Sequence, residues 1–212
     1  MTSVKKRCEL ISWARFYNLS RLLSHKIHDS GFRPDIIIAI ARGGYMPARI
    51  ISDFLHVMNL TSFKIEHYRG TRKKRKAFVR YPLGPGVAGG KVLLVDDVCD
   101  TGDTFGVASK HLGERIQALE IRTAVLHYKK TSSFIPDFYA RRMVKWRWII
   151  YPWAAAEDIS EFIKQMKPGP DNSIEIRQIL ARDHGVMIPQ HVLRDIMTLS
   201  QIRIKKVQQV ES

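Results

Sequence analysis

The sequence has few cysteines, no long apolar run and a shortage of acidic residues. Only two cysteines, Cys8 and Cys99, occur in 212 residues, so a disulfide framework is implausible and we expect a reducing compartment. No apolar run reaches the roughly 18 residues that a membrane span needs. The polar segment 1–9 lacks the hydrophobic region of a secretory signal peptide. These absences predict a cytoplasmic protein that does not enter a membrane.

Acidic residues are scarce relative to basic ones, with 20 Asp and Glu against 35 Lys and Arg, a formal net charge of +15. Residues 154–212 contain eight of each kind, so the whole excess lies in residues 1–153. Such a field attracts polyanionic ligands to that part of the chain. It also permits weak nonspecific contact with nucleic acid, but specific nucleic-acid binding is not expected.

The most informative stretch is residues 92–104. It begins with a continuous apolar run of strand length, which is typical of a buried parallel strand. Two acids, Asp96 and Asp97, follow the run, and then come Asp100, Thr101, Gly102, Asp103 and Thr104. In open α/β sheets, ligands bind beyond the carboxyl ends of strands. Carboxylates there accept hydrogen bonds from sugar hydroxyls or metal-bound water, and a turn that opens a helix offers N–H groups to phosphate.

This stretch resembles the phosphoribosyl-pyrophosphate (PRPP) motif of type I phosphoribosyltransferases. The resemblance implies that Asp96 and Asp97 hold the ribose hydroxyls and the waters of a Mg2+ ion that binds mainly through PRPP, with no certain direct metal ligand. It also implies a 5′-phosphate site formed by Asp100, Thr101, Gly102, Asp103 and Thr104. Asp100 matches the family residue near purine N7 and is the candidate general acid/base.

A second strand and loop precede this motif. Residues 35–41 are predicted to be a buried strand, and Arg42, Gly43 and Gly44 follow it. The family binds pyrophosphate with the backbone amides of this loop. Two glycines permit tight curvature against an anion, and Arg42 supplies a countercharge.

Residues 64–83 carry eight cations and one acid. No apolar periodicity survives across residues 70–77, so this segment is predicted to be a mobile loop. The family has a flexible lid here, which excludes water over the polyanion; a solvated charge run or a nucleic-acid patch is the alternative. The lid residues are Tyr68, Arg69, Arg72, Lys73, Lys74, Arg75 and Lys76.

The purine pocket is predicted from Lys129, Trp148 and Ile149, which resemble the hood of 6-oxopurine phosphoribosyltransferases. The resemblance implies that Lys129 faces the purine, that Trp148 stacks on it and that the backbone of Ile149 contacts the base edge. A flat indole on a flat heteroaromatic excludes water and gains dispersion. The alternative for Trp148 is an ordinary core or interface aromatic.

Alternating strands and helices predict an α/β fold, a mainly parallel sheet flanked by helices. Beyond residue 153 the pattern changes to three helices with breaks at 168–170 and 184–185. We therefore predict a phosphoribosyltransferase core with its hood at 1–153 and a C-terminal three-helix bundle at 154–212. Residues 179–196 also resemble a helix-turn-helix, but the neutral extension does not suit a recognition helix, which should be basic.

Two purine classes compete for the base site. The Lys129 ammonium suits a 6-oxo group and favours hypoxanthine, but Ala154, Ala155 and Ala156 stand where the family often has an acid near the 2-amino group of guanine. The lost acid and the added helices resemble crenarchaeal adenine phosphoribosyltransferases of the 6-oxopurine-enzyme type. We therefore predict a homodimeric enzyme that converts adenine and PRPP to AMP and pyrophosphate. The alternatives are a hypoxanthine enzyme and, less favoured, a nucleotide-sensing regulator that binds nucleic acid.

Overall fold

The computed structural model describes residues 6–67, 77–87 and 90–202. It divides into two compact units. The sheet unit is residues 17–146, and the hood unit combines residues 1–16 with residues 147–212. Each unit is described by itself.

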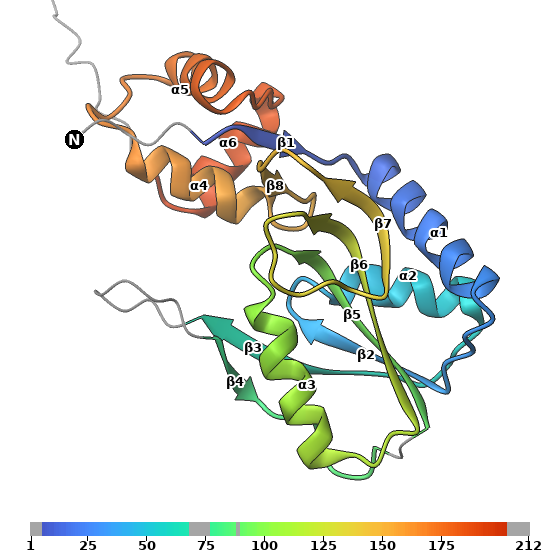
Figure 1. Cartoon of the computed structure of the whole chain (residues 1–212). Helices are drawn as coiled ribbons and strands as arrows, with labels where there is room; N and C mark the ends of the chain where they lie inside the picture. The colour runs from blue at the N-terminus through green and yellow to red at the C-terminus, as the bar shows by residue number, and fades with distance from the viewer. Residues whose placement is uncertain (1–5, 68–76, 88–89, 203–212) are drawn as a thin grey trace, which may run out of the picture. The chain divides into compact units, whose positions relative to one another are not determined.

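The sheet unit is built on a six-stranded sheet with the strand order β4-β3-β2-β5-β6-β7 (Figure 1). Its strands are β2 (Ile36–Ala41), β3 (Leu60–His67), β4 (Ala77–Tyr81), β5 (Lys91–Cys99), β6 (Glu120–Lys129) and β7 (Phe138–Met143). All neighbours are parallel except β4, which runs antiparallel to β3. The predicted α/β fold with a mainly parallel sheet is confirmed.

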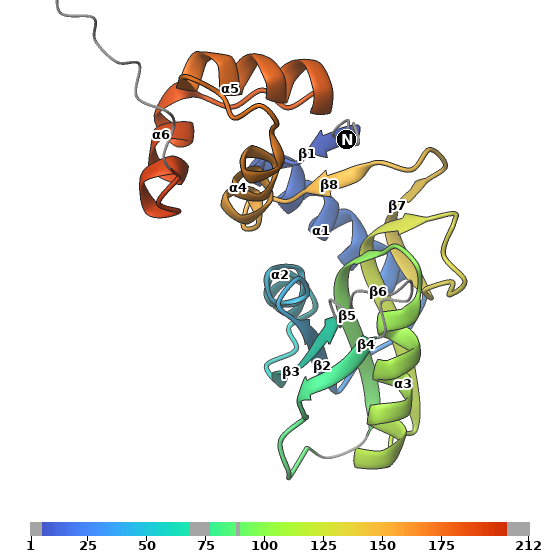
Figure 2. The same cartoon turned by 90° about the vertical axis from the view of Figure 1, so that its left-hand side faces the viewer.

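Helices flank this sheet on both sides. They are α1 (Trp13–Asp29), which starts in the hood unit, α2 (Tyr45–Leu55) and α3 (Asp103–Arg115). Figure 2 shows α2 and α3 on opposite faces of the sheet. On α3 the buried residues Phe105, Ala108 and Leu112 recur at helical spacing, so one stripe of the helix faces the apolar core.

Strand β5 forms the centre of the core. Each residue from Val92 to Val95 has no exposed surface, as the continuous apolar run predicts for a strand covered on both faces. We expected the strand to end at residue 96, but it continues to Cys99 because β6 keeps pairing with it, with Val98 opposite His127. The paired acids Asp96 and Asp97 therefore lie inside the strand, near its carboxyl end.

The hood unit joins the two ends of the described chain. Strand β1 (Cys8–Leu10) pairs in parallel with β8 (Trp148–Ile150). The helical part contains α4 (Ala155–Gln165), α5 (Ser173–Ile179), the π-helical turn η1 (Leu180–His184) and α6 (Gln190–Leu199). The C-terminal helices are thus present as predicted, although η1 replaces the last turn of the helix expected at 173–183.

A hydrophobic cluster holds the hood unit together. This hood cluster consists of Cys8, Ile150, Ile159, Phe162, Ile163, Met166, Ile176, Leu180, Val186, Ile188, Leu193, Ile196 and Met197. Because Cys8 and Ile150 share it with the helices, the compact unit takes in β1 and β8. This division differs from the expected boundary after residue 153, which stays a prediction about function.

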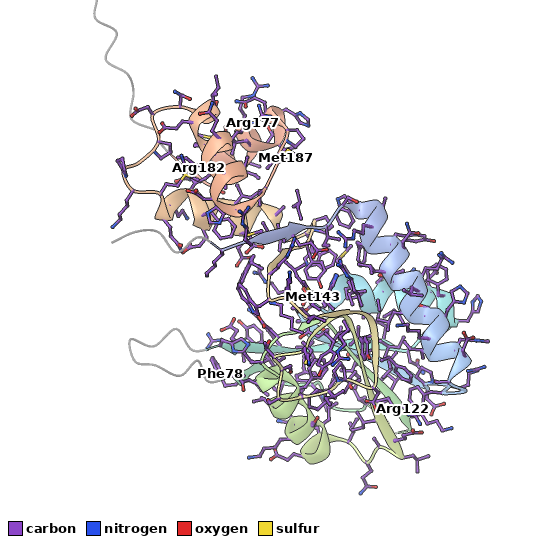
Figure 3. The ribbon with its side chains drawn as sticks, turned by 45° about the horizontal axis from the view of Figure 1, so that its top comes forward. Phe78, Arg122, Met143, Arg177, Arg182 and Met187 are labelled. Carbon is purple, nitrogen blue, oxygen red and sulfur yellow. The ribbon has the colours of Figure 1, made fainter. Side chains whose placement is uncertain are left out.

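Two arginines of the helical part make contacts inside the hood unit (Figure 3). Arg177 Nε donates to the Ile188 carbonyl at 3.1 Å, which connects α5 to the segment before α6. Arg182 Nε donates to Asp183 Oδ1 at 2.9 Å. Among the described helices, none is long and apolar enough to cross a membrane.

Candidate functional site: the carboxyl edge of the sheet

The neighbouring parallel strands β2, β5 and β6 end at one edge of the sheet. Figure 3 marks the two ends of the sheet unit: Met143, at the end of β7, is opposite Lys129 in register, whereas Arg122 lies near the start of β6. The predicted residues of the sheet unit therefore collect at this carboxyl edge. They come from the loop after β2, from the end of β5 and the loop that follows it, and from the end of β6.

The two adjacent acids have different environments. Asp96 is only 8% exposed, and its Oδ1 accepts the backbone N–H of Asp97 at 2.9 Å. Burial raises the pKa of Asp96 well above its ordinary value, the charge of Asp97 adds to the rise, and the backbone hydrogen bond opposes it. Asp97 is half-buried, and successive strand residues point to opposite faces. Asp97 is thus the better placed of the two to meet a ligand.

Glycines bring the loop after β2 against the end of β5. A Cβ on Gly43 would lie 2.5 Å from Asp97 Oδ2, and one on Gly44 would lie 2.7 Å from the Ile40 carbonyl oxygen. At Gly44 the backbone leaves no room for a side chain, and at Gly43 a side chain would displace the carboxylate of Asp97. The predicted pyrophosphate loop thus lies directly beside Asp97. Arg42 is exposed, and the Ala41–Arg42 peptide bond is cis.

The loop after β5 has a shape that requires glycine. Gly102 adopts φ +96°, and a Cβ there would lie 2.6 Å from Phe134 Cβ. Ser133 braces the loop, since its backbone N and its Oγ donate to the Thr101 carbonyl at 3.0 and 2.9 Å. Helix α3 starts directly after Gly102, so its first N–H groups are available to an anion.

Asp103 and Thr104 complete this loop. The exposed carboxylate of Asp103 accepts a hydrogen bond from Thr101 Oγ1 at 3.0 Å, which engages the threonine hydroxyl in this structure. Thr104 Oγ1 lies 3.3 Å from Nε2 of His67, at the end of β3. His67 was not among the predicted site residues, and its only signal in the sequence is its place directly before the basic loop.

Asp100 and Lys129 were predicted separately, and the structure joins them. Lys129 Nζ donates to Asp100 Oδ2 at 2.8 Å, and Lys129 is 3% exposed. Trp146 Nε1 donates to the other carboxylate oxygen, Oδ1, at 3.1 Å. Trp146 was not among the predicted site residues, because nothing in its local sequence distinguishes it from an ordinary surface aromatic.

Trp148 and Ile149 belong to β8 in the hood unit. Trp148 is half-buried and packs against the hood cluster, with Lys6 Nζ 5.1 Å from its ring centroid. Burial raises the pKa of Asp158 to about 6, and a hydrogen bond from Trp148 opposes the rise. The role of Trp148 and Ile149 at the base stays a prediction.

The lid residues Tyr68, Arg69, Arg72, Lys73, Lys74, Arg75 and Lys76 lie outside the described residues.

The carboxyl edge suits a magnesium ion that arrives with its substrate. In the described ranges, no group of three His, Cys, Asp or Glu side chains could cage a metal ion. Asp97 presents a hard oxygen ligand beside Gly43, where no side chain stands between the carboxylate and the loop. Mg2+ commonly keeps several waters and binds through one or two carboxylates plus substrate phosphates, which fits this arrangement.

Comparisons with known proteins agree with this geometry. The family described as "Phosphoribosyl transferase domain" matches residues 9–158. Xanthine-guanine phosphoribosyltransferase from Desulfotalea psychrophila is 29% identical over 153 residues, which are 72% of this chain and 90% of that protein. The enzyme of the same name from Cereibacter sphaeroides is 25% identical over 154 residues, 69% of this chain and 86% of that protein.

Solved structures show the same relationship. A purine phosphoribosyltransferase from Pyrococcus horikoshii is 31% identical with a TM-score of 0.60, and the alignment covers 69% of this chain and 93% of that one. A hypothetical protein from Neisseria gonorrhoeae with bound ppGpp is 28% identical with a TM-score of 0.62, covering 78% and 98%. The chain therefore belongs to the phosphoribosyl transferase family.

The predicted choice of adenine is wrong. The curated relatives are named xanthine-guanine phosphoribosyltransferases, which points to 6-oxopurines. The prediction gave the C-terminal helices more weight than Lys129. A lysine ammonium only donates hydrogen bonds, so it cannot accept one from the 6-amino group of adenine.

Proposed function

We propose that this member of the phosphoribosyl transferase family joins PRPP and a 6-oxopurine to give a nucleoside 5′-monophosphate and pyrophosphate, as in purine salvage. One observation carries the choice of base. The buried ammonium of Lys129 is held by Asp100 at the carboxyl edge of the sheet, next to the loop that opens α3. The names of the curated relatives support the same class of base.

The chemistry of Lys129 favours an oxygen at purine position 6. An ammonium has three donors, and Asp100 takes one of them. A second can reach O6 as a charge-assisted hydrogen bond, worth more than a neutral one. The 6-amino group of adenine is also a donor, so it cannot form a hydrogen bond with the Lys129 ammonium. The buried ammonium would then lack an acceptor at the base.

Within the 6-oxopurines, two observations point different ways. The alanines at 154–156 leave the 2-amino group of guanine without the acid that the family often has there. The relatives' names and the ppGpp bound to the Neisseria protein favour guanine-type ligands. We therefore propose 6-oxopurines as a class.

The reaction breaks the bond between ribose C1′ and the pyrophosphate oxygen and forms a bond from C1′ to a purine nitrogen. Asp97 would hold the ribose hydroxyls, and the first turn of α3 with Thr101 and Thr104 would hold the 5′-phosphate. Arg42, Gly43 and Gly44 would bind the departing pyrophosphate. Mg2+, bound with PRPP, would supply positive charge to the leaving group.

The purine loses a ring proton when the new bond forms. Asp100 is the group that would accept it, because its carboxylate is tied to Lys129 at the predicted base position. Trp148 would stack on the ring, and Ile149 would contact the base edge through its backbone.

The deciding assay offers hypoxanthine, guanine, xanthine and adenine separately with PRPP and Mg2+ and measures pyrophosphate release. We expect turnover of at least one 6-oxopurine and no turnover of adenine. Lys129→Met should raise the KM of the preferred base by about 10- to 100-fold, the effect of losing one charge-assisted hydrogen bond. Absence of PRPP-dependent turnover with every 6-oxopurine would contradict the proposal.

The proposal extends to the oligomeric state and to the division of the chain. The active protein is a homodimer, which light scattering after size-exclusion chromatography would test. Residues 1–153 carry the transferase activity, and residues 154–212 are an addition to it. A cytoplasmic location stays a prediction from the sequence.

A further inference from the structure

Trp146 is an exposed aromatic residue whose contacts are directed at two charges. It lies three residues after the end of β7 and is 43% exposed. Its Nε1 donates to Asp100 Oδ1 at 3.1 Å, and Lys129 Nζ lies 4.5 Å from its ring centroid. A side chain this exposed contributes little to core packing, and these two contacts connect it to Asp100 and Lys129.

The contacts of Trp146 help to offset the desolvation of the buried Lys129 ammonium. A buried ammonium is destabilising unless it is paired and hydrogen-bonded, and Lys129 is 3% exposed. Asp100 pairs with it but keeps about a third of its own side chain exposed, at 34%. The indole offers its π face to the cation and its N–H to the anion, so one side chain stabilises both members of the pair.

We infer that Trp146 is a positioning residue, which holds Asp100 and Lys129 as one fixed cluster in the free protein, ready for the base. The roles of Asp100 and Lys129 toward the purine rest on the proposed function. The cluster itself is a property of the sheet unit alone, since all three residues belong to it.

The cluster constrains both functional side chains before the base arrives. Asp100 has a donor on each carboxylate oxygen, Lys129 on Oδ2 and Trp146 on Oδ1, so the plane of the carboxylate is fixed. A lysine side chain has a flexible four-carbon stem, and the indole face restricts where its ammonium can lie. Loss of Trp146 should therefore weaken binding of the base and leave binding of PRPP nearly unchanged.

Two variants separate the two contacts. Trp146→Phe keeps an aromatic face for Lys129 but removes the N–H donor, and Trp146→Leu removes both. We expect the KM of the preferred 6-oxopurine to rise about 3- to 10-fold in Trp146→Phe and about 10- to 100-fold in Trp146→Leu, with the KM of PRPP within about 2-fold.

The matched control is Trp13→Phe. Trp13 is 54% exposed and its ring contacts are to Phe16 and Trp153, so both KM values should stay unchanged. An equal rise of both KM values in Trp146→Phe would indicate a merely structural role and overturn the inference. Unchanged KM values for the base in both Trp146 variants would overturn it as well.

A measurement without substrate tests the cluster directly. In a 15N–1H spectrum of the free protein, the indole signal of Trp146 is the one lost in Trp146→Phe. We expect Asp100→Asn and Lys129→Met each to shift that signal, and a signal that moves in neither variant would overturn the inference. If the signal shifts but no 6-oxopurine is turned over, the cluster is supported and the proposed function fails.

Discussion

The sheet unit and the hood unit build their cores from the chain in different ways. The sheet unit is one continuous segment, 17–146, whereas the hood unit combines the two ends of the chain. In the sheet unit, the carboxyl edge collects acids, a buried lysine and glycines that have no room for a side chain. In the hood unit, a hydrophobic cluster surrounds a single strand pair. Most of the predicted ligand residues thus belong to the sheet unit, and the described part of the hood unit depends mainly on apolar packing.

The largest expected effect tests the apolar packing of the hood unit. Leu193 on α6 has no exposed surface and belongs to the hood cluster. Leu193→Ala should lower the free energy of unfolding by about 2–5 kcal/mol, since it leaves a cavity. Leu199→Ala on the same helix is the matched control, because Leu199 is 84% exposed and its loss should cost less than about 0.5 kcal/mol.

These two variants would be compared by urea unfolding, with PRPP affinity measured alongside. We expect Leu193→Ala to leave PRPP affinity within about 3-fold, because the predicted PRPP residues lie in the sheet unit. If Leu193→Ala lowers the free energy of PRPP binding by as much as the free energy of unfolding, PRPP binding is not a property of the sheet unit alone. That result would contradict the contrast between the two units.

The next effect concerns the backbone of the phosphate loop. Gly102→Ala places a Cβ at φ +96° against Phe134, so stability should fall by about 1–3 kcal/mol and the KM of PRPP should rise. Gly106→Ala on α3 meets nothing within 4 Å and should stabilise by about 0.5–1 kcal/mol. Calorimetry and PRPP kinetics check both, and a neutral Gly102→Ala would contradict the account of the loop.

A smaller effect separates the paired acids. Asp97→Asn should raise the KM of PRPP about 10- to 100-fold, whereas Asp96→Asn should raise it less than about 5-fold. The reason is that Asp96 is nearly buried and its Oδ1 accepts the Asp97 N–H, an acceptor role that the amide oxygen of asparagine can keep; burial also raises the pKa of Asp96. Steady-state kinetics at fixed Mg2+ decides this, and the opposite ranking would count against it.

The smallest effect concerns Asp158, the acid with raised pKa beside Trp148 in the hood unit. Its folded pKa of about 6 exceeds its ordinary value of 3.8, so the folded state binds more protons between these values. Stability from this group is therefore greatest below pH 4 and falls as the pH rises toward 6. Asp158→Asn should be more stable than the parent at pH 7 by about 1–2 kcal/mol, after allowance for partial solvent screening.

Melting temperatures from pH 4 to pH 8 test this prediction. The difference between parent and Asp158→Asn should vanish near pH 4 and grow as the pH rises. Parallel profiles for the two proteins across this range would show that Asp158 does not titrate as described.

Structural features that depend on neighbours along the chain were predicted from the local sequence. The apolar run 92–95 predicted the central strand, and its residues have no exposed surface. Gly43 and Gly44 were predicted to permit tight curvature of the loop after residue 41, and at Gly44 the surrounding backbone leaves no room for a Cβ. These features follow from periodicity and backbone conformation, which the sequence carries directly.

Features that depend on distant contacts were not predictable in this way. The pairing of Cys8 with Trp148 joins residues 140 positions apart in parallel register, and no periodic pattern encodes that partner. The contact of Trp146 with Asp100 spans 46 positions and depends on the pairing of β7 beside β6. The choice of adenine failed for a related reason, because an added segment was given more weight than the donor chemistry of Lys129.

The most direct test of the account is the structure of the protein with a bound purine nucleoside 5′-monophosphate. We expect the 5′-phosphate at residues 101–104, in contact with the backbone N–H groups that open α3, and the ribose hydroxyls near Asp97. A phosphate bound at any other part of the chain would contradict the assignment of this edge as the PRPP site.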